Sequence, residues 1–224
     1  MSAFGILFDM DGVLVDTNPT HNEALIRLFD RYQIPYDQDA LNRRAHGRPN
    51  SEWIPDFMGV TTQAEIQQIA DEKESLFREL YKGRLKALNG LLPLLDLLQL
   101  YDIKMAVATS APIENANFIL DGLSLRAYFQ AVLHAGDVTL GKPHPQIYQK
   151  AAAALGLAAK DCIVIEDSIV GVQSGLAAGA KVIGVTTTHS AAELKAQGTS
   201  MIIKDFFELG MDQLIGVMGT DDSN

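Results

Sequence analysis

Two aspartates separated by one residue follow a short apolar stretch near the start of the chain, in the sequence GILFDMDGVLVDT. Ile6, Leu7 and Phe8 suit a buried strand, and Asp9 and Asp11 come directly after it. Because successive strand residues point to opposite faces, the two carboxylates can share one face. Close carboxylates repel each other, and a hard divalent cation such as Mg2+ would offset that repulsion and still accept a substrate phosphate. Taken alone, the pair could also be a solvated acidic turn.

Other predicted strand ends carry side chains that suit phosphate chemistry. One strand runs into Thr109 and Ser110, where a hydroxyl and backbone N–H groups can bind phosphate, although such residues often only cap a helix. Lys142 lies in the sequence GKPHP, whose prolines would hold its charge in a rigid turn. A further apolar strand ends in Glu166 and Asp167. Acids and a lysine at the ends of parallel strands are what Mg2+-assisted phosphoryl transfer requires.

The elements that would position these residues alternate between helices and short apolar strands from Gly90 onward. This alternation predicts an α/β fold with a Rossmann-like, mostly parallel sheet that is covered by helices on both faces. Ligands bind such sheets at the carboxyl ends of the strands. After the first strand at residues 6–8, the predicted strands are 104–108, 131–134, 162–165, 181–185 and 201–203, and the glycines suited to left-handed helix caps are Gly122, Gly156, Gly179 and Gly198.

A separate helical region is predicted directly after the first motif, because no buried-strand pattern occurs there. Asn18 followed by Pro19 suits a capped helix start, and Thr62 with Glu65 three residues later is a capping-box pattern. The prediction is therefore an α/β core with a small all-helical domain inserted into it. The core would comprise residues 1–16 and 86–224, and the insertion residues 17–85.

Composition narrows the class of protein. With 224 residues, of which 47% are hydrophobic, the chain is long enough for one sizeable core and a smaller domain. The net charge of −10 argues against a nucleic-acid partner, but local cations and a metal can still bind a small phosphate. The apolar runs are too short for a membrane span, and no basic leader is present, so we expect a cytoplasmic protein. The single cysteine, Cys162, is expected to be a buried core thiol.

Together the motifs resemble the haloacid dehalogenase (HAD) superfamily, and within it the β-phosphoglucomutase-like phosphatase branch. DMDGVLVDT, the ATS strand end, GKPHP and VIEDSIVGVQSGLAAG occur in the family's order and at its usual spacing. The resemblance covers essentially the whole chain. It implies that the core is HAD-like and that the helical insertion is a cap domain.

The resemblance also implies a role for each motif residue. Asp9 would be the nucleophile that forms an aspartyl phosphate, and Asp11 would be the general acid and base. The dehalogenases of the superfamily lack this second aspartate, so Asp11 favours phosphoryl chemistry. The implied Mg2+ ligands are the Asp9 side chain, the Asp11 backbone carbonyl and Asp167, with Glu166 close by, and the implied phosphate-binding residues are Thr109, Ser110 and Lys142.

The insertion would decide between hydrolysis and phosphate transfer to a sugar. His21 and Lys73 fall where β-phosphoglucomutases carry a cap histidine and a hinge lysine, although either could be an ordinary solvated residue. The mutases place a lysine just before a glycine and an arginine three residues after it. Here those positions hold His46 and Asn50, and Arg48 follows the glycine directly.

The sequence HGR, like the segment 186–189 (TTTH), resembles the small-metabolite phosphatases of this branch. The prediction is a phosphatase that acts on a small sugar or polyol phosphate, with His46, Arg48 and Asn50 as specificity candidates. The main alternative is a β-phosphoglucomutase. More distant alternatives are a phosphonate hydrolase, which would need Lys73 or Lys82 to form a Schiff base, and a non-catalytic metabolite-binding protein. The sequence does not indicate an oligomeric state.

Overall fold

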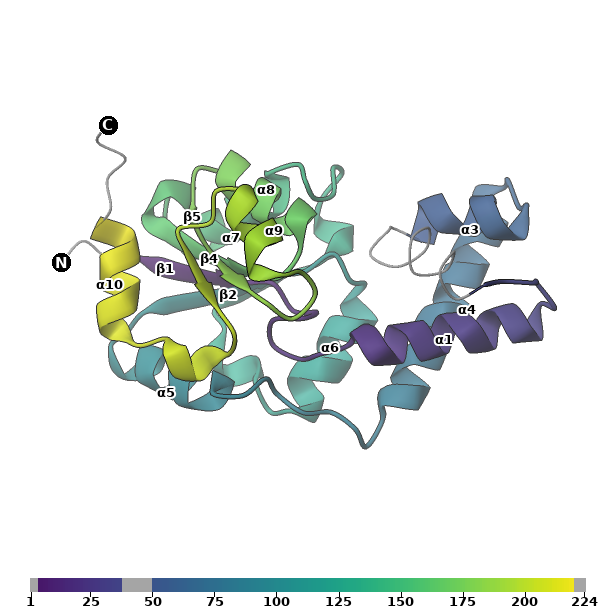
Figure 1. Ribbon diagram of the computed structural model, residues 1–224, viewed down its shortest axis with the longest axis horizontal. Coiled ribbons are helices and arrows are strands. Elements are labelled where there is room, and N and C mark those ends of the chain that lie inside the picture. Colours follow the sequence, from purple (N-terminus) through teal and green to yellow (C-terminus); the bar gives the residue numbers. More distant parts are fainter. Residues whose placement is uncertain (1–3, 38–49, 220–224) are drawn as a thin grey trace. The chain divides into compact units, whose positions relative to one another are not determined.

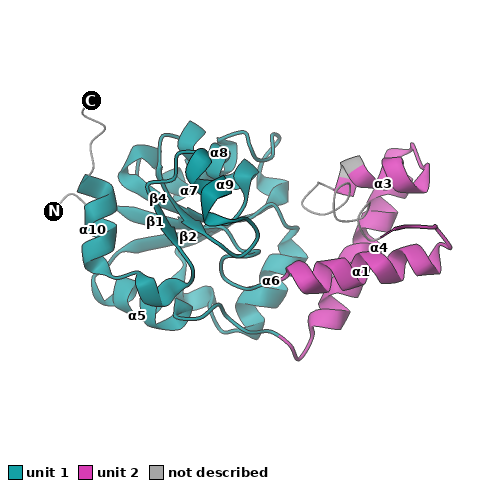
Figure 2. Cartoon of the chain, viewed as in Figure 1, with its two compact units in different colours: residues 1–16, 85–224 teal, residues 17–84 magenta. Residues whose placement is uncertain are grey.

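The computed structural model describes residues 4–37 and 50–219, and the chain divides into two compact units (Figure 2). Unit 1 comprises residues 1–16 and 85–224, and unit 2 comprises residues 17–84. Unit 2 is therefore one continuous segment inserted between the first strand of unit 1 and the rest of that unit. In the described parts of both units, no helix is long and apolar enough to cross a membrane.

The described part of unit 1 contains a six-stranded sheet in the order β3-β2-β1-β4-β5-β6, and every neighbouring pair is parallel. The predicted α/β class is confirmed, and the predicted strand bounds differ from the observed ones by no more than one residue. Strand β3 ends one residue earlier than predicted, and β4 continues to Glu166. The strands are β1 (Gly5–Phe8), β2 (Lys104–Ala108), β3 (Ala131–Leu133), β4 (Cys162–Glu166), β5 (Lys181–Val185) and β6 (Met201–Ile203).

Alternate strand residues face opposite sides of the sheet, so both sides present apolar residues, and a layer of helices covers each side. Ile6 and Phe8 pack into one apolar cluster with residues of α5, α6 and α10, whereas Leu7 packs into the other with residues of α7, α8 and α9 (Figure 1). Burial on both faces explains why the strands are almost wholly apolar. The covering helices are α5 (Leu91–Leu100), α6 (Ile113–Gly122), α7 (Gln146–Ala154), α8 (Ile169–Ala177), α9 (Ala191–Ala196) and α10 (Met211–Gly219).

Three of the four predicted glycine caps are confirmed, since Gly156, Gly179 and Gly198 all have positive φ. The prediction for Gly122 is wrong: it is the last residue of α6, and the residue with positive φ there is Ser124. A Cβ at Gly122 would lie 2.5 Å from the side chain of Leu85. Close packing, rather than backbone conformation, accounts for that glycine.

The regular elements in the described part of unit 2 are all helices. It contains α1 (Asn18–Arg31), α3 (Asn50–Met58) and α4 (Gln63–Tyr81), which bury an apolar cluster that includes Phe29 and Trp53. Thr62 caps α4 as predicted, because its hydroxyl accepts the backbone N–H of Glu65 at 3.3 Å.

Two expectations about the helices of unit 2 are corrected. The cap position of α1 is Thr17, whose side chain makes no capping hydrogen bond, and Asn18 is the first helical residue. Helix α3 was not predicted from the sequence, because Pro55 interrupts its helical pattern.

Candidate active site

Three buried carboxylates converge at the carboxyl edge of the sheet. Strand β1 lies between β2 and β4, and the backbone N–H of Asp9 donates to the carbonyl of Ile165 at 3.0 Å, which sets Asp9 beside the acids that end β4. Asp9 is 7% exposed, Glu166 0% and Asp167 3%. Carboxylate oxygens of these three residues lie within 4.8 Å of one another. A hard divalent cation prefers such an oxygen cluster, so the donor set fits a metal site.

Lys142 supplies a buried positive charge to this cluster. Its ammonium donates to Asp9 Oδ1 at 2.8 Å, to Glu166 Oε1 at 2.7 Å and to the hydroxyl of Tyr148 at 2.9 Å. Burial opposes the charge on Lys142, but the carboxylates of Asp9 and Glu166 outweigh burial and raise its pKa. The predicted lysine is thus brought directly to the predicted nucleophile.

Glu166 holds the lysine and the following turn together. Its Oε1 accepts from Lys142 and from the hydroxyl of Tyr148, the latter at 2.8 Å. Its Oε2 accepts the backbone N–H groups of Asp167 and Ser168 and the Ser168 hydroxyl. Burial alone would raise the pKa of Glu166, but Lys142 and these hydrogen bonds lower it, so the group is ionised at neutral pH. Its partners make Glu166 an organiser of the lysine as well as a member of the acidic cluster.

Two close approaches require glycine. A Cβ on Gly171, in the first turn of α8, would lie 1.7 Å from Glu166 Oε1. A Cβ on Gly12 would lie 1.8 Å from Asp167 Oδ2, and Gly12 has a φ of 76°. The turn after Asp11 closes with the N–H of Gly12 donating to the carbonyl of Val15 at 2.7 Å. The glycines therefore make room for the acids.

The other two carboxyls of the cluster, those of Asp9 and Asp167, have raised pKa values. Burial raises the pKa of Asp9 to about 7, with Lys142 opposing the shift and Glu166 adding to it. Burial, together with the charges of Glu166 and Asp9, raises the pKa of Asp167 well above its ordinary value. The hydroxyl of Thr188 donates to Asp167 Oδ2 and orients that carboxyl. A bound dication would stabilise the ionised form of both groups.

The two predicted hydroxyl residues after β2 differ in their surroundings. Thr109 is buried, and its hydroxyl accepts the backbone N–H of Ala111 at 3.0 Å, which shapes the turn before α6. Ser110 is exposed. Since β2 pairs with β1, both follow a strand that ends next to Asp9. Of the two hydroxyls, the one on Ser110 is the more accessible to a ligand.

The candidates in unit 2 form a polar group of their own. The ammonium of Lys73 lies 2.9 Å from His21 Nδ1, and Asn50 donates to the carboxylate of Glu74 at 2.9 Å. The candidates His46 and Arg48 lie outside the described residues.

Tyr148 and Thr188 are site residues that were not predicted from the sequence. Tyr148 is fully buried on α7, and nothing in its spacing from the GKPHP motif indicates that its hydroxyl returns to Lys142 and Glu166. Thr188 lies in the TTTH segment, which drew attention only as a resemblance.

Removing the Tyr148 hydroxyl should weaken the buried cluster. Tyr148→Phe keeps the ring but leaves Glu166 and Lys142 each with one partner fewer, so we expect the free energy of unfolding to fall by about 1–3 kcal/mol in urea denaturation. The matched control is Tyr128→Phe, whose hydroxyl donates to Asp96 at the surface and should cost less than about 0.5 kcal/mol. Equal losses in the two variants would contradict the structural role of the Tyr148 hydroxyl.

Comparison with known proteins places the chain in a family. Residues 5–179 match the family model described as haloacid dehalogenase-like hydrolase. A phosphorylated carbohydrates phosphatase of Thermotoga maritima is 35% identical over 85% of this chain and 88% of its own length. A beta-phosphoglucomutase of Bacillus subtilis is 30% identical over 80% of this chain and 82% of its own length. The crystal structure of a HAD hydrolase, family IA, variant 3, from Entamoeba histolytica superposes with a TM-score of 0.91 at 28% identity, covering 97% of this chain and 100% of the other. The chain belongs to the haloacid dehalogenase-like hydrolase family.

Proposed function

We propose that the protein is an Mg2+-dependent phosphatase that hydrolyses a small phosphomonoester through a phosphorylated Asp9. The observation that carries this proposal is the buried Asp9 carboxylate, which Lys142 contacts at 2.8 Å beside the acids that end β4. A carboxylate nucleophile must approach a phosphate that is itself negative, and a lysine and a metal site at the same place offset that repulsion.

The reaction has two steps. In the first, a carboxylate oxygen of Asp9 bonds to phosphorus, the bond from phosphorus to the substrate oxygen breaks, and Asp11 gives its proton to the leaving oxygen. In the second, Asp11 takes a proton from water as the water oxygen bonds to phosphorus and the bond from phosphorus to the Asp9 oxygen breaks, which releases inorganic phosphate and restores the Asp9 carboxylate. Asp11 is partly buried two residues after Asp9, and general acid and base catalysis needs this proximity.

The other residues hold charge in place during both steps. Lys142 faces the Asp9 oxygen and would bind the transferring phosphoryl group, together with Ser110 and the turn that Thr109 shapes. Asp9, Asp167, the Asp11 backbone carbonyl and Glu166 would hold Mg2+, which supplies Lewis-acid stabilisation of the phosphoryl oxygens when it is bound. Glu166 and Tyr148 keep the Lys142 ammonium directed at Asp9.

The substrate class we propose is a sugar or polyol phosphate. The carbohydrate phosphatase relative supports it, as does the absence from residues 46–50 of the lysine and arginine arrangement expected of a mutase. Unit 2 would act as the cap that selects the substrate, with His21, Lys73, Asn50, His46 and Arg48 as the candidate residues. Water as the acceptor makes the enzyme a phosphatase.

Replacement of the nucleophile tests the proposed chemistry. Asp9→Asn removes the attacking carboxylate oxygen, so phosphate release from sugar phosphates should fall by at least about a thousandfold. Asp212→Asn, an exposed position in α10, makes the same charge change and should leave the rate unchanged. Phosphate release close to the wild-type rate from the Asp9 variant would refute the proposed role of Asp9.

Removal of the metal tests the cofactor. Dialysis against a chelator should abolish phosphate release, because the buried acids then repel each other and the incoming phosphate. Added Mg2+ should restore the rate, and Ca2+ should restore much less, because Mg2+ demands compact octahedral coordination. A chelator-treated protein with full activity would contradict a metal-dependent reaction.

The second candidate is a β-phosphoglucomutase, which the relative from Bacillus subtilis favours. The two functions differ only in the acceptor of the Asp9 phosphoryl group. Incubation with Mg2+, β-glucose 1-phosphate and a trace of glucose 1,6-bisphosphate separates them when inorganic phosphate and glucose 6-phosphate are followed in parallel. We expect phosphate release to exceed isomerisation, and rapid glucose 6-phosphate formation without phosphate release would establish the mutase instead.

A further inference from the structure

A chain of buried and partly buried side chains connects all three described helices of unit 2 through hydrogen bonds. Lys73 and Glu74 are adjacent on α4 and only 7% and 8% exposed, and the Lys73 ammonium lies 2.8 Å from Glu74 Oε1. Neighbouring positions on a helix do not normally face each other, so their side chains must converge from different directions. The ammonium also contacts His21 on α1 at 2.9 Å.

The chemistry of lysine fixes the state of His21. An ammonium group has donors and no acceptor, so Nδ1 of His21 must accept, which places the ring proton on Nε2. The ring stacks on Phe77 at a centroid distance of 3.9 Å and an interplanar angle of 9°. Phe77 therefore sets the plane of the His21 ring, and Lys73 fixes its tautomer and the direction of Nδ1 within that plane.

Glu74 connects this pair to α3. Its Oε1 also accepts from Asn50 Nδ2 at 2.9 Å, and Asn50 Oδ1 accepts the indole N–H of Trp53 at 3.0 Å. Asn50 is the first residue of α3. Trp53, the next residue in this series of hydrogen bonds, is 1% exposed in the core of unit 2. The amide of Asn50 is thus held between a carboxylate and an indole.

The charge of Glu74 is maintained despite burial. Burial alone would raise the pKa of Glu74, but the charge of Lys73 and the hydrogen bonds from Lys73 and Asn50 lower it to about 2. Buried ion pairs are a poor route to stability, because desolvation cancels much of their attraction. A role in orienting polar groups explains the pair better than a stabilising role does.

We propose that Glu74 is a positioning residue for substrate selection. It holds Lys73, and through it His21, in a fixed orientation, and it fixes the amide of Asn50 inside unit 2. This inference rests on the proposed function of unit 2 as the cap. It gives Asn50, a specificity candidate from the sequence, a role inside unit 2. In the described part of the chain, the Lys73 ammonium has two partners, which leaves one of its three N–H groups for a further acceptor.

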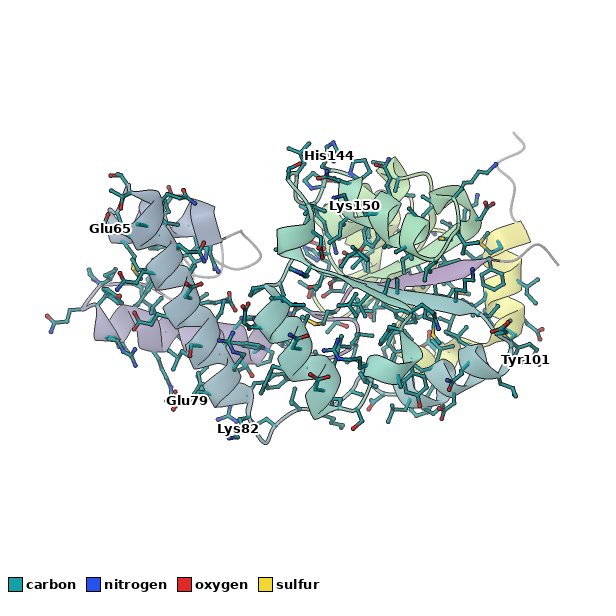
Figure 3. The ribbon with its side chains drawn as sticks, turned by 180° about the vertical axis from the view of Figure 1, so that it is seen from behind. Glu65, Glu79, Lys82, Tyr101, His144 and Lys150 are labelled. Atoms are coloured by element: carbon teal, nitrogen blue, oxygen red, sulfur yellow. The ribbon has the colours of Figure 1, made fainter. Side chains whose placement is uncertain are left out.

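The test compares Glu74→Gln with Glu79→Gln, a matched change of charge at an exposed position of the same helix, labelled in Figure 3. Because Trp53 is the single tryptophan of the chain, its indole N–H gives one resolved NMR signal that reports the bond to Asn50. Glu74→Gln should shift this signal and the ring nitrogen signals of His21. The Glu79 variant should leave both where they are in the wild type.

The kinetic arm separates positioning from general damage. For Glu74→Gln we expect KM for a hexose phosphate to rise by about tenfold or more, the loss expected for a hydrogen bond to a charged group, while kcat/KM for p-nitrophenyl phosphate changes less than about threefold. Equal losses on both substrates, or an unchanged KM with unshifted NMR signals, would overturn the proposal.

Two further measurements keep the test decisive. If Glu74→Gln does not fold, Asn50→Ala breaks the same chain and keeps the Lys73–Glu74 ion pair, and it should shift the Trp53 signal and raise KM for the hexose phosphate. An unshifted Trp53 signal in Asn50→Ala would overturn the proposal. If the wild-type protein hydrolyses neither substrate, the proposed function fails, whereas the NMR comparison still decides whether Glu74 orders His21 and Trp53.

Discussion

The balance of charge at the carboxyl edge of the sheet is the constraint on which the rest of unit 1 depends. Asp9, Glu166 and Asp167 are buried together, and Lys142 is the cation that contacts two of them. An unpaired buried charge is very costly, so the backbone must bring the lysine, the glycines and the turn hydroxyls to fixed places. The parallel sheet does this because the carboxyl ends of β1, β2 and β4 lie side by side. The topology of the sheet and the positions of the charged side chains of the site therefore depend on each other.

Much of the fold could be predicted from the sequence because burial on both faces leaves strong local patterns. The short apolar runs at residues 104–108 and 181–185 are typical of strands buried on both faces, and the observed strands have these bounds. Helix α3 was not predicted because Pro55 breaks its periodicity. The prediction for Gly122 was wrong because a glycine beside a close neighbour looks the same in sequence as a glycine with positive φ.

The charged members of the candidate site were predictable for a different reason. Acids at the ends of apolar strands conflict with the local pattern, and such conflicts mark function. The hydroxyl of Tyr148 gave no such conflict, since a tyrosine suits an amphipathic helix whether or not its hydroxyl has a partner. The bond from Asn50 to Glu74 was equally hard to predict, because Glu74 is distant in sequence and lies on another helix. Contacts of this kind depend on tertiary packing, which produces no periodic pattern in the sequence.

The junction between the two units lies in a hydrogen-bonded part of unit 1. Val15 pairs with Ala87 across an antiparallel bridge, and the N–H of Leu88 donates to the carbonyl of Leu14 at 2.9 Å. The chain therefore leaves unit 1 and returns to it at adjacent points. Holding the ends of a long insertion together costs entropy that grows only slowly with its length. An insertion of different length or sequence can thus replace residues 17–84 with little cost to the sheet.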